Sequence, residues 1–192
     1  MEGNLIIDFT PTGMIPVKSL TPHVPVSIYE IIEDIHFAWE LGITKVHLHA
    51  RDPQTEKSTY KKEIYAAIIE GIRKFAPTLV VCVSLSGRTF NRFEERSEAL
   101  ELEGFLKPDM GSLTLSSLNF NKIESLNSPD MIHNLAVKMK KLGIVPELEA
   151  FDAGMINYAK YLIKKGLLTP PYNSIFYWVI LLVLRQIFYM PE

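Results

Sequence analysis

The stretch SIYEIIEDIHFAWELGITKVHLH, residues 27–49, contains the pattern that the rest of the chain repeats. Apolar residues recur every three or four positions after the serine that opens it, which is typical of an amphipathic helix, and Glu30 completes a capping box with that serine. Gly42 is a typical helix terminator, and the short apolar run after it indicates a strand. We therefore predict a helix over 27–41 and a strand over 45–49.

The same alternation continues on both sides of this stretch, with no linker rich in Pro, Gly or Ser between the units. Five strand–helix units in a row predict an α/β fold in which parallel strands are buried on both faces. The strands are expected over 4–10, 45–49, 79–84, 109–115 and 145–151, and the helices over 27–41, 60–75, 93–104, 130–142 and 155–165.

Such a sheet is either doubly wound or closed into a (β/α)8 barrel. No GxGxxG or GxxxxGK[ST] phosphate-binding loop follows any of the expected strands, which favours the TIM-barrel type. A barrel usually takes about 250 residues and eight units. A chain of 192 residues with five units therefore predicts an incomplete barrel.

Composition restricts the function classes. The chain has 20 Lys+Arg against 22 Asp+Glu and no basic run, which argues against nucleic-acid binding. Cys82 is its one cysteine, so an internal disulfide or a cysteine-built zinc site is excluded, and a cytoplasmic location is expected.

The run HLHARD, residues 47–52, suggests metal chemistry. His47 and His49 leave the same face of a strand, so both imidazoles can bind one metal ion, although bonds to loop carbonyls explain such a pair equally well. A catalytic zinc usually takes three protein ligands. Candidates for the third, which could instead pair with arginines or cap the next helix, are Glu147, Glu149 and Asp152.

Two other strand ends carry groups suited to a substrate. Ser84, Ser86 and the backbone around Gly87 form a potential anion nest, to which Arg88 adds a positive charge for a carboxylate. An ordinary strand-to-helix turn explains the same residues. Hydroxyl groups alternate along the next strand, at Ser112 and Thr114, and could line a substrate or bond to neighbouring backbone.

Several motifs together resemble the β-keto acid cleavage enzymes, a family that includes 3-keto-5-aminohexanoate cleavage enzyme. The resemblance covers about residues 4–173 in order. The motifs are PTG at 11–13, VHLHARD at 46–52, VSLSGR at 83–88, DMGSLTLSSLNF at 109–120, NSPDMI at 127–132 and PELEAFDAGMI at 146–156.

This resemblance implies a (β/α)8 barrel that forms a homo-oligomer, usually a tetramer, and binds zinc at the carboxyl ends of its strands. It implies condensation of a small β-keto acid with acetyl-CoA and C–C cleavage to acetoacetate and an acyl-CoA. It also implies that His47 and His49 bind the metal, that the substrate carboxylate contacts Ser84, Gly87 and Ser112, and that Glu149 is an acidic residue of the pocket. Taking this together with the strand-end residues described above, we predict Glu149 and Arg51 as catalytic residues and Ser86 and Thr114 as further substrate contacts.

The chain also departs from the family. The late RxGxED motif that carries the third metal ligand and catalytic residues is not present, and Met14 stands near where one branch has a glutamate. Residues 174–192 do not resemble the family, so we divide the chain into a partial barrel, 1–173, and an atypical hydrophobic tail, 174–192. We expect a truncated or frameshifted member with impaired activity. The alternative is a non-catalytic metal- or carboxylate-binding barrel fragment.

The tail contains ten consecutive apolar residues, 175–184. A membrane-spanning helix needs about 20. A membrane anchor is therefore not expected.

Overall fold

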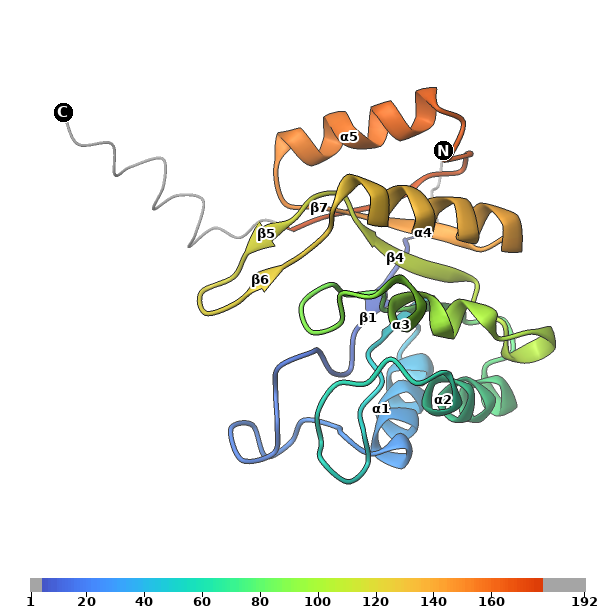
Figure 1. Cartoon of the computed structure of the whole chain (residues 1–192). Coiled ribbons are helices and arrows are strands. Elements are labelled where there is room, and N and C mark those ends of the chain that lie inside the picture. Colours follow the sequence, from blue (N-terminus) through green and yellow to red (C-terminus); the bar gives the residue numbers. More distant parts are fainter. Residues whose placement is uncertain (1–4, 178–192) are drawn as a thin grey trace.

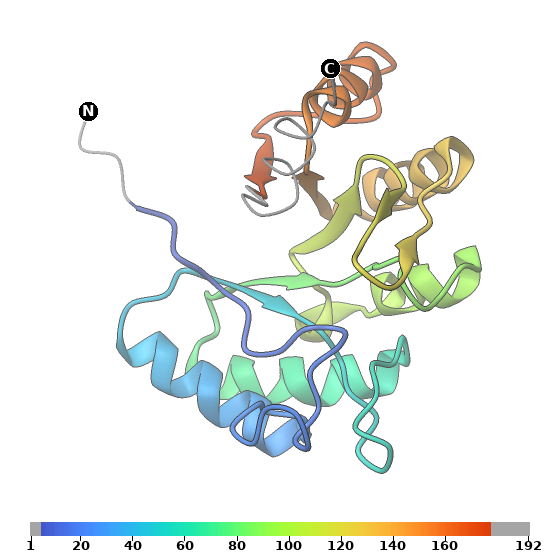
Figure 2. The ribbon, with the colours of Figure 1, turned by 90° about the vertical axis from the view of Figure 1, so that its left-hand side faces the viewer.

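A computed structural model describes residues 5–177, in which helices pack along one side of a curved parallel sheet (Figures 1 and 2). Six strands lie in the order β1-β2-β3-β4-β7-β8. They are β1 (Asp8–Phe9), β2 (Lys45–Leu48), β3 (Val80–Val83), β4 (Met110–Thr114), β7 (Val145–Ala150) and β8 (Asn173–Phe176). Every strand pairs in parallel with its neighbour, and the spatial order never reverses. This singly wound order is that of a barrel and not of a doubly wound sheet.

The remaining elements connect these strands. The helices are α1 (Ile28–Glu40), α2 (Lys62–Phe75), α3 (Phe93–Ser97), α4 (Pro129–Leu142) and α5 (Ala153–Lys164). Two 3₁₀ turns, η1 (Glu98–Glu101) and η2 (Gly104–Leu106), follow α3. A small antiparallel hairpin, β5 (Leu118–Asn119) and β6 (Glu124–Ser125), precedes α4.

Local sequence determines where the clearest helices begin and end. The capping box of α1 is present, because the Ser27 hydroxyl accepts from the Glu30 N–H at 3.2 Å and Glu30 accepts from the Ser27 N–H at 3.0 Å. Helix α4 begins after Ser128, which caps it, and ends at Gly143, whose φ of 64° is the left-handed conformation favoured by glycine. The ends of both helices agree with the sequence prediction to within about a residue.

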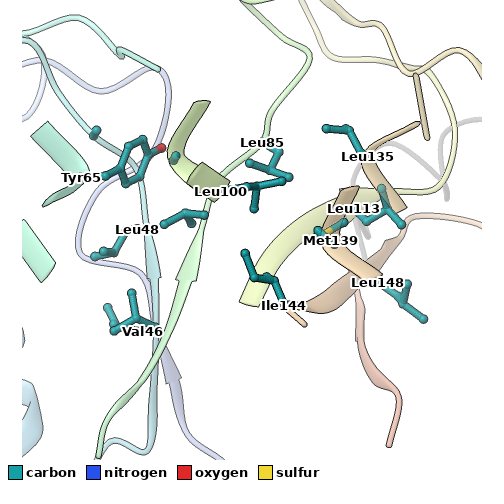
Figure 3. Close-up of a cluster of buried hydrophobic side chains, with 14 of the residues drawn as sticks. Val46, Leu48, Tyr65, Leu85, Leu100, Leu113, Leu135, Met139, Ile144 and Leu148 are labelled. Atoms are coloured by element: carbon teal, nitrogen blue, oxygen red, sulfur yellow. The ribbon is translucent and has the colours of Figure 1, made fainter. Parts of the chain in front are cut away.

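Alternation along the strands separates an apolar face from a polar one. Val46, Leu48, Leu113 and Leu148 point toward the helices and pack with residues such as Leu135 in one buried cluster (Figure 3). Their neighbours along the strands therefore face the interior of the curved sheet. These interior residues are the polar ones, His47, Ser112, Thr114, Glu147 and Glu149, together with Cys82.

Contacts between distant strands show how strongly the sheet curves. His47 of β2 contacts Glu147 of β7, although β3 and β4 lie between the two strands. In a flat sheet those two strands would be roughly 14 Å apart, at about 4.8 Å per step. Lys45 of β2 likewise contacts Asn173 of β8. The described residues therefore form an incomplete barrel, as the sequence predicted.

Some elements differ from the prediction. The first strand is two residues long where we expected seven, and the helix expected over 93–104 ends after one turn and is followed by 3₁₀ turns. Extended backbone at Leu102 and Glu103 and a φ of 59° at Gly104 interrupt that helix. The hairpin β5–β6 was not predicted.

Strand β8 begins at Asn173 and pairs with β7 across the proposed domain boundary at residue 173. Most of the proposed tail, residues 178–192, lies outside the described residues, so this boundary stays a prediction. Among residues 5–177, no helix is long and apolar enough to cross a membrane.

Candidate active site

The polar interior residues meet a pocket of about 350 Å³ at the carboxyl ends of the strands. His49 follows β2, Ser84 and Ser86 follow β3, Thr114 ends β4, and Glu149 lies near the end of β7. All five line the pocket. Active sites of barrel enzymes lie at this end, so the pocket is the candidate active site.

His47 is held by a buried chain of charged groups below the pocket. Its Nδ1 lies 2.6 Å from Oε1 of Glu147, a side chain with no exposed surface. The other oxygen of Glu147 accepts from Lys45, whose Nζ also lies 2.9 Å from Asp8 and 3.2 Å from Asn173. Glu147 therefore has both carboxylate oxygens occupied by described side chains.

The pKa values in this chain of contacts follow from burial and pairing. Burial alone would raise the pKa of Glu147, but hydrogen bonds from His47 and Lys45 lower it to about 2. Burial would lower the pKa of His47, and its bond to Glu147 reverses this and raises it. A carboxylate that stays ionised beside Nδ1 requires that this nitrogen carry the hydrogen.

His49 is the unsatisfied member of the histidine pair. The centroids of the His47 and His49 rings are 5.0 Å apart, and Nδ1 of His49 is buried without a hydrogen-bond partner among the described residues. Burial, together with the charges of His47, Arg51 and Arg88, lowers the pKa of His49 well below its usual value. A neutral imidazole with an unused nitrogen is the form that binds metals, so His49 has the chemistry of a metal ligand, and metal binding by the pair stays a prediction.

The structure also separates the candidates for a third ligand. Glu147 is paired with Lys45, and Asp152 caps α5 by accepting from the Met155 N–H at 2.9 Å. Glu149 lines the pocket, where one oxygen accepts from the Thr114 hydroxyl and burial raises its pKa. The sulfur of Cys82 lies with His47 and Glu147 in a cluster whose potential ligand atoms are within 4.8 Å of one another.

Two residues expected to bind substrate contact the protein backbone instead of lining the pocket. Ser112 accepts from the Leu85 N–H at 2.9 Å. A Cβ on Gly87 would lie 2.2 Å from the Leu126 carbonyl oxygen and 2.8 Å from Arg96, so only glycine fits there. Direct substrate binding by Ser112 and Gly87 stays a prediction, whereas their contacts already fix the turn after β3.

Arg96 is a structural residue that the sequence analysis missed. It is 4% exposed and donates to the carbonyls of Leu85 and Leu126 and to Oδ1 of Asn127, at 2.7–2.9 Å. These bonds attach the turn after β3 to the segment before α4. The sequence analysis placed Arg96 in the helix expected over 93–104, and the charged residues around it gave no local sign that this side chain is buried.

Arg51 also donates its hydrogen bonds to backbone carbonyl groups. It is 1% exposed and donates to the carbonyls of Gly13, Pro16 and Glu56, which holds two loops together. It does not line the pocket. Its catalytic role stays a prediction, and its hydrogen bonds show that it positions these two loops.

The fold and the site define a barrel-type protein with its pocket at the carboxyl ends of the strands. Residues 4–182 match the family described as beta-keto acid cleavage enzyme, and the chain belongs to this family.

Relatives within the family have distinct names. The chain is 39% identical over 166 residues to the 3-oxoadipate:acetyl-CoA acetyltransferase of Cupriavidus necator. This match covers 86% of this chain and 56% of that protein. It is 33% identical over 168 residues to the 3-keto-5-aminohexanoate cleavage enzyme of Acetoanaerobium sticklandii, covering 87% and 60%. The chain thus spans less than two thirds of the length of either relative.

A solved structure of ObcA without ligand has a similar fold. The TM-score is 0.72 at 22% identity, over 80% of this chain and 36% of ObcA. At this identity the likeness supports the fold alone.

Replacing Gly87 with alanine tests the close approach of the turn to Arg96. We expect G87A to lower the free energy of unfolding by about 1–3 kcal/mol, because the new methyl group collides with a backbone carbonyl. Urea unfolding followed by circular dichroism measures this. The control is G13A, whose Cβ would have 3.9 Å of clearance. Equal stability of the two variants would contradict the packing described here.

Proposed function

We propose that this chain acts in β-keto acid cleavage, the reaction of a small β-keto acid with acetyl-CoA that gives acetoacetate and a shorter acyl-CoA. The observation that carries the proposal is the pair of imidazoles, His47 and His49, beside a pocket that also exposes Thr114 and Glu149, in a member of this family.

The substrate class is proposed from the relatives and from the pocket. The names of the two relatives include 3-oxoadipate and 3-keto-5-aminohexanoate, both small β-keto acids, and one also names acetyl-CoA. A pocket of about 350 Å³ suits an acid of that size. We therefore propose a small β-keto acid as substrate and acetyl-CoA as co-substrate.

The proposed metal is zinc, held by His47 and His49. A bound divalent ion supplies Lewis-acid polarisation of a keto oxygen. In the neutral form of His47, Glu147 accepts the Nδ1 hydrogen, and the lone pair of Nε2 is then the one that would bind the ion. Glu147 is thus a positioning residue for His47, while Lys45 neutralises its charge.

The remaining assignments concern substrate binding and proton transfer. Ser84, Ser86 and Thr114 offer hydroxyl groups to a substrate in the pocket. Glu149 is the candidate catalytic residue, because its carboxyl group lines the pocket and its raised pKa suits a group that holds and releases a proton. The Thr114 hydroxyl bonds to one of its oxygens and fixes its orientation.

The metal assignment predicts zinc binding that depends on specific residues. We expect H47A and H49A to abolish zinc binding, and E147Q to weaken it by about 10- to 100-fold because His47 loses its charged partner. Competition against a chromophoric chelator measures the affinity. H36A is the matched control, since His36 is a half-exposed residue of α1 that does not line the pocket. If H36A reduced zinc binding as much as H47A, the assignment would be wrong.

The enzymatic proposal predicts slow acetoacetate release by the 192-residue chain supplied with 3-oxoadipate, acetyl-CoA and zinc. We expect E149Q to reduce the rate by at least about 100-fold through loss of the proton-transfer group. The control E124Q changes an exposed carboxylate on β6. NMR detection of acetoacetate measures the rate.

The same assay separates the alternative function. A chain that binds zinc through His47 and His49 but releases no acetoacetate would be a metal-binding barrel fragment and not an enzyme. Release that is equal in E149Q and E124Q would contradict the role of Glu149.

We also propose a homo-oligomer in the cytoplasm. Strands β1 and β8 are the two edges of the described sheet, and Leu5, Ile6 and Ile7 before β1 are 41–76% exposed. Apolar residues beside an unpaired edge favour association. Light scattering coupled to gel filtration should give a multiple of 21.9 kDa. We expect I6E to lower the mass and F37E, at an exposed site on α1, to leave it unchanged. A monomeric wild-type chain would contradict the proposal.

A further inference from the structure

Arg88 is the positively charged side chain of the pocket. Among the described residues that line it, Arg88 is the single Arg or Lys. Its guanidinium carbon lies 3.4 Å from the centroid of the Phe120 ring, so the guanidinium is stacked on the aromatic face.

The guanidinium makes no hydrogen bond or ion pair to another residue within 5–177, and its buried Nε has no partner there. Arg51 and Arg96, in contrast, are buried, and their N–H groups donate to carbonyl and amide oxygens of the described residues. A partly buried guanidinium without such partners is costly, unless an anion binds to it.

The backbone holds Arg88 in place. Its N–H donates to the Ser86 hydroxyl at 3.3 Å, and the same turn is attached to Arg96 through the Leu85 carbonyl. Phe120, from the loop after β5, supports the guanidinium from one side. Stacking on a ring occupies a face of the guanidinium and uses none of its N–H groups, so the Nη groups can still donate to a planar bidentate ligand.

Other groups on the same turn are already engaged. The Ser112 hydroxyl accepts from the Leu85 N–H, and Gly87 packs against the Leu126 carbonyl. The strongest group left for an anion in this part of the pocket is therefore the guanidinium, next to the hydroxyls of Ser84 and Ser86.

We propose that Arg88, stacked on Phe120, binds the carboxylate of the acid that enters this pocket and selects anionic over neutral ligands. The identification of that acid as a β-keto acid rests on the proposed function. Acetyl-CoA brings phosphates, a second source of anionic oxygen, and the test must separate the two sources.

The test measures dissociation constants of the full 192-residue chain by isothermal titration calorimetry. The probes are acetoacetate, its neutral analogue acetoacetamide, the carboxylate butyrate, which lacks the keto group, and coenzyme A. We expect acetoacetate to bind at least about tenfold more tightly than acetoacetamide, because only the carboxylate pairs with the guanidinium.

We expect R88Q to weaken acetoacetate binding by at least about tenfold and to leave acetoacetamide binding unchanged. R88K keeps the charge but loses the bidentate set of donors, so its affinity for acetoacetate should lie between those of R88Q and the wild type. The matched control R92Q removes an exposed arginine at the start of α3 and should bind like the wild type. Urea midpoints of all variants confirm that they fold.

The other outcomes have distinct meanings. Equal acetoacetate binding by R88Q and the wild type, no acetoacetate binding at all, or an Arg88 effect confined to coenzyme A would overturn the inference. Binding of acetoacetate and butyrate with equal affinity, both dependent on Arg88, would support the anion site and count against the keto-acid function. Preference for acetoacetate over butyrate without dependence on Arg88 would support the keto-acid function and overturn the proposed role of Arg88.

Discussion

The contact between Glu147 and its two cationic neighbours, Lys45 and His47, is the interaction on which the interior depends. It joins β2 to β7 across two intervening strands, so it forms only when the sheet curves. Curvature in turn brings the carboxyl ends of the strands around one pocket. Removing one partner would leave a buried charge uncompensated, which typically costs about 3–5 kcal/mol. The same carboxylate that joins β2 to β7 also orients a histidine of the site.

The two glutamates on the inner face of β7, Glu147 and Glu149, have separate roles because they lie at different distances from the pocket. Glu147 lies below the pocket, where Lys45 neutralises it, and its pKa is about 2. Glu149 lies one step closer to the strand end, where it bonds to the neutral hydroxyl of Thr114 and burial raises its pKa. Residues that share one face of a strand differ here by their distance from the strand end. That difference assigns the first to structure and makes the second available to a ligand.

The sequence predicted which residues face the interior but not what they contact. Alternation along each strand was enough to place His47, Ser112 and Glu147 on the polar face. Contacts across the sheet, such as His47 with Glu147, depend on strand order and curvature, which a local pattern does not contain. Arg51 shows the same limit, because its neighbours in HLHARD suggested chemistry while its partners are carbonyls at positions 13, 16 and 56.

Short elements escaped prediction for a related reason. The hairpin β5–β6 has two residues in each strand, too few for a period of two to be recognised, yet its loop supplies Phe120 beneath Arg88. The arginines then differ by what surrounds them and not by their sequence context. Arg96 meets carbonyl groups and becomes part of the framework. Arg88, two residues beyond Ser86, meets an aromatic face that accepts no strong hydrogen bond, so its donors are not used by that contact and can serve a ligand in the pocket.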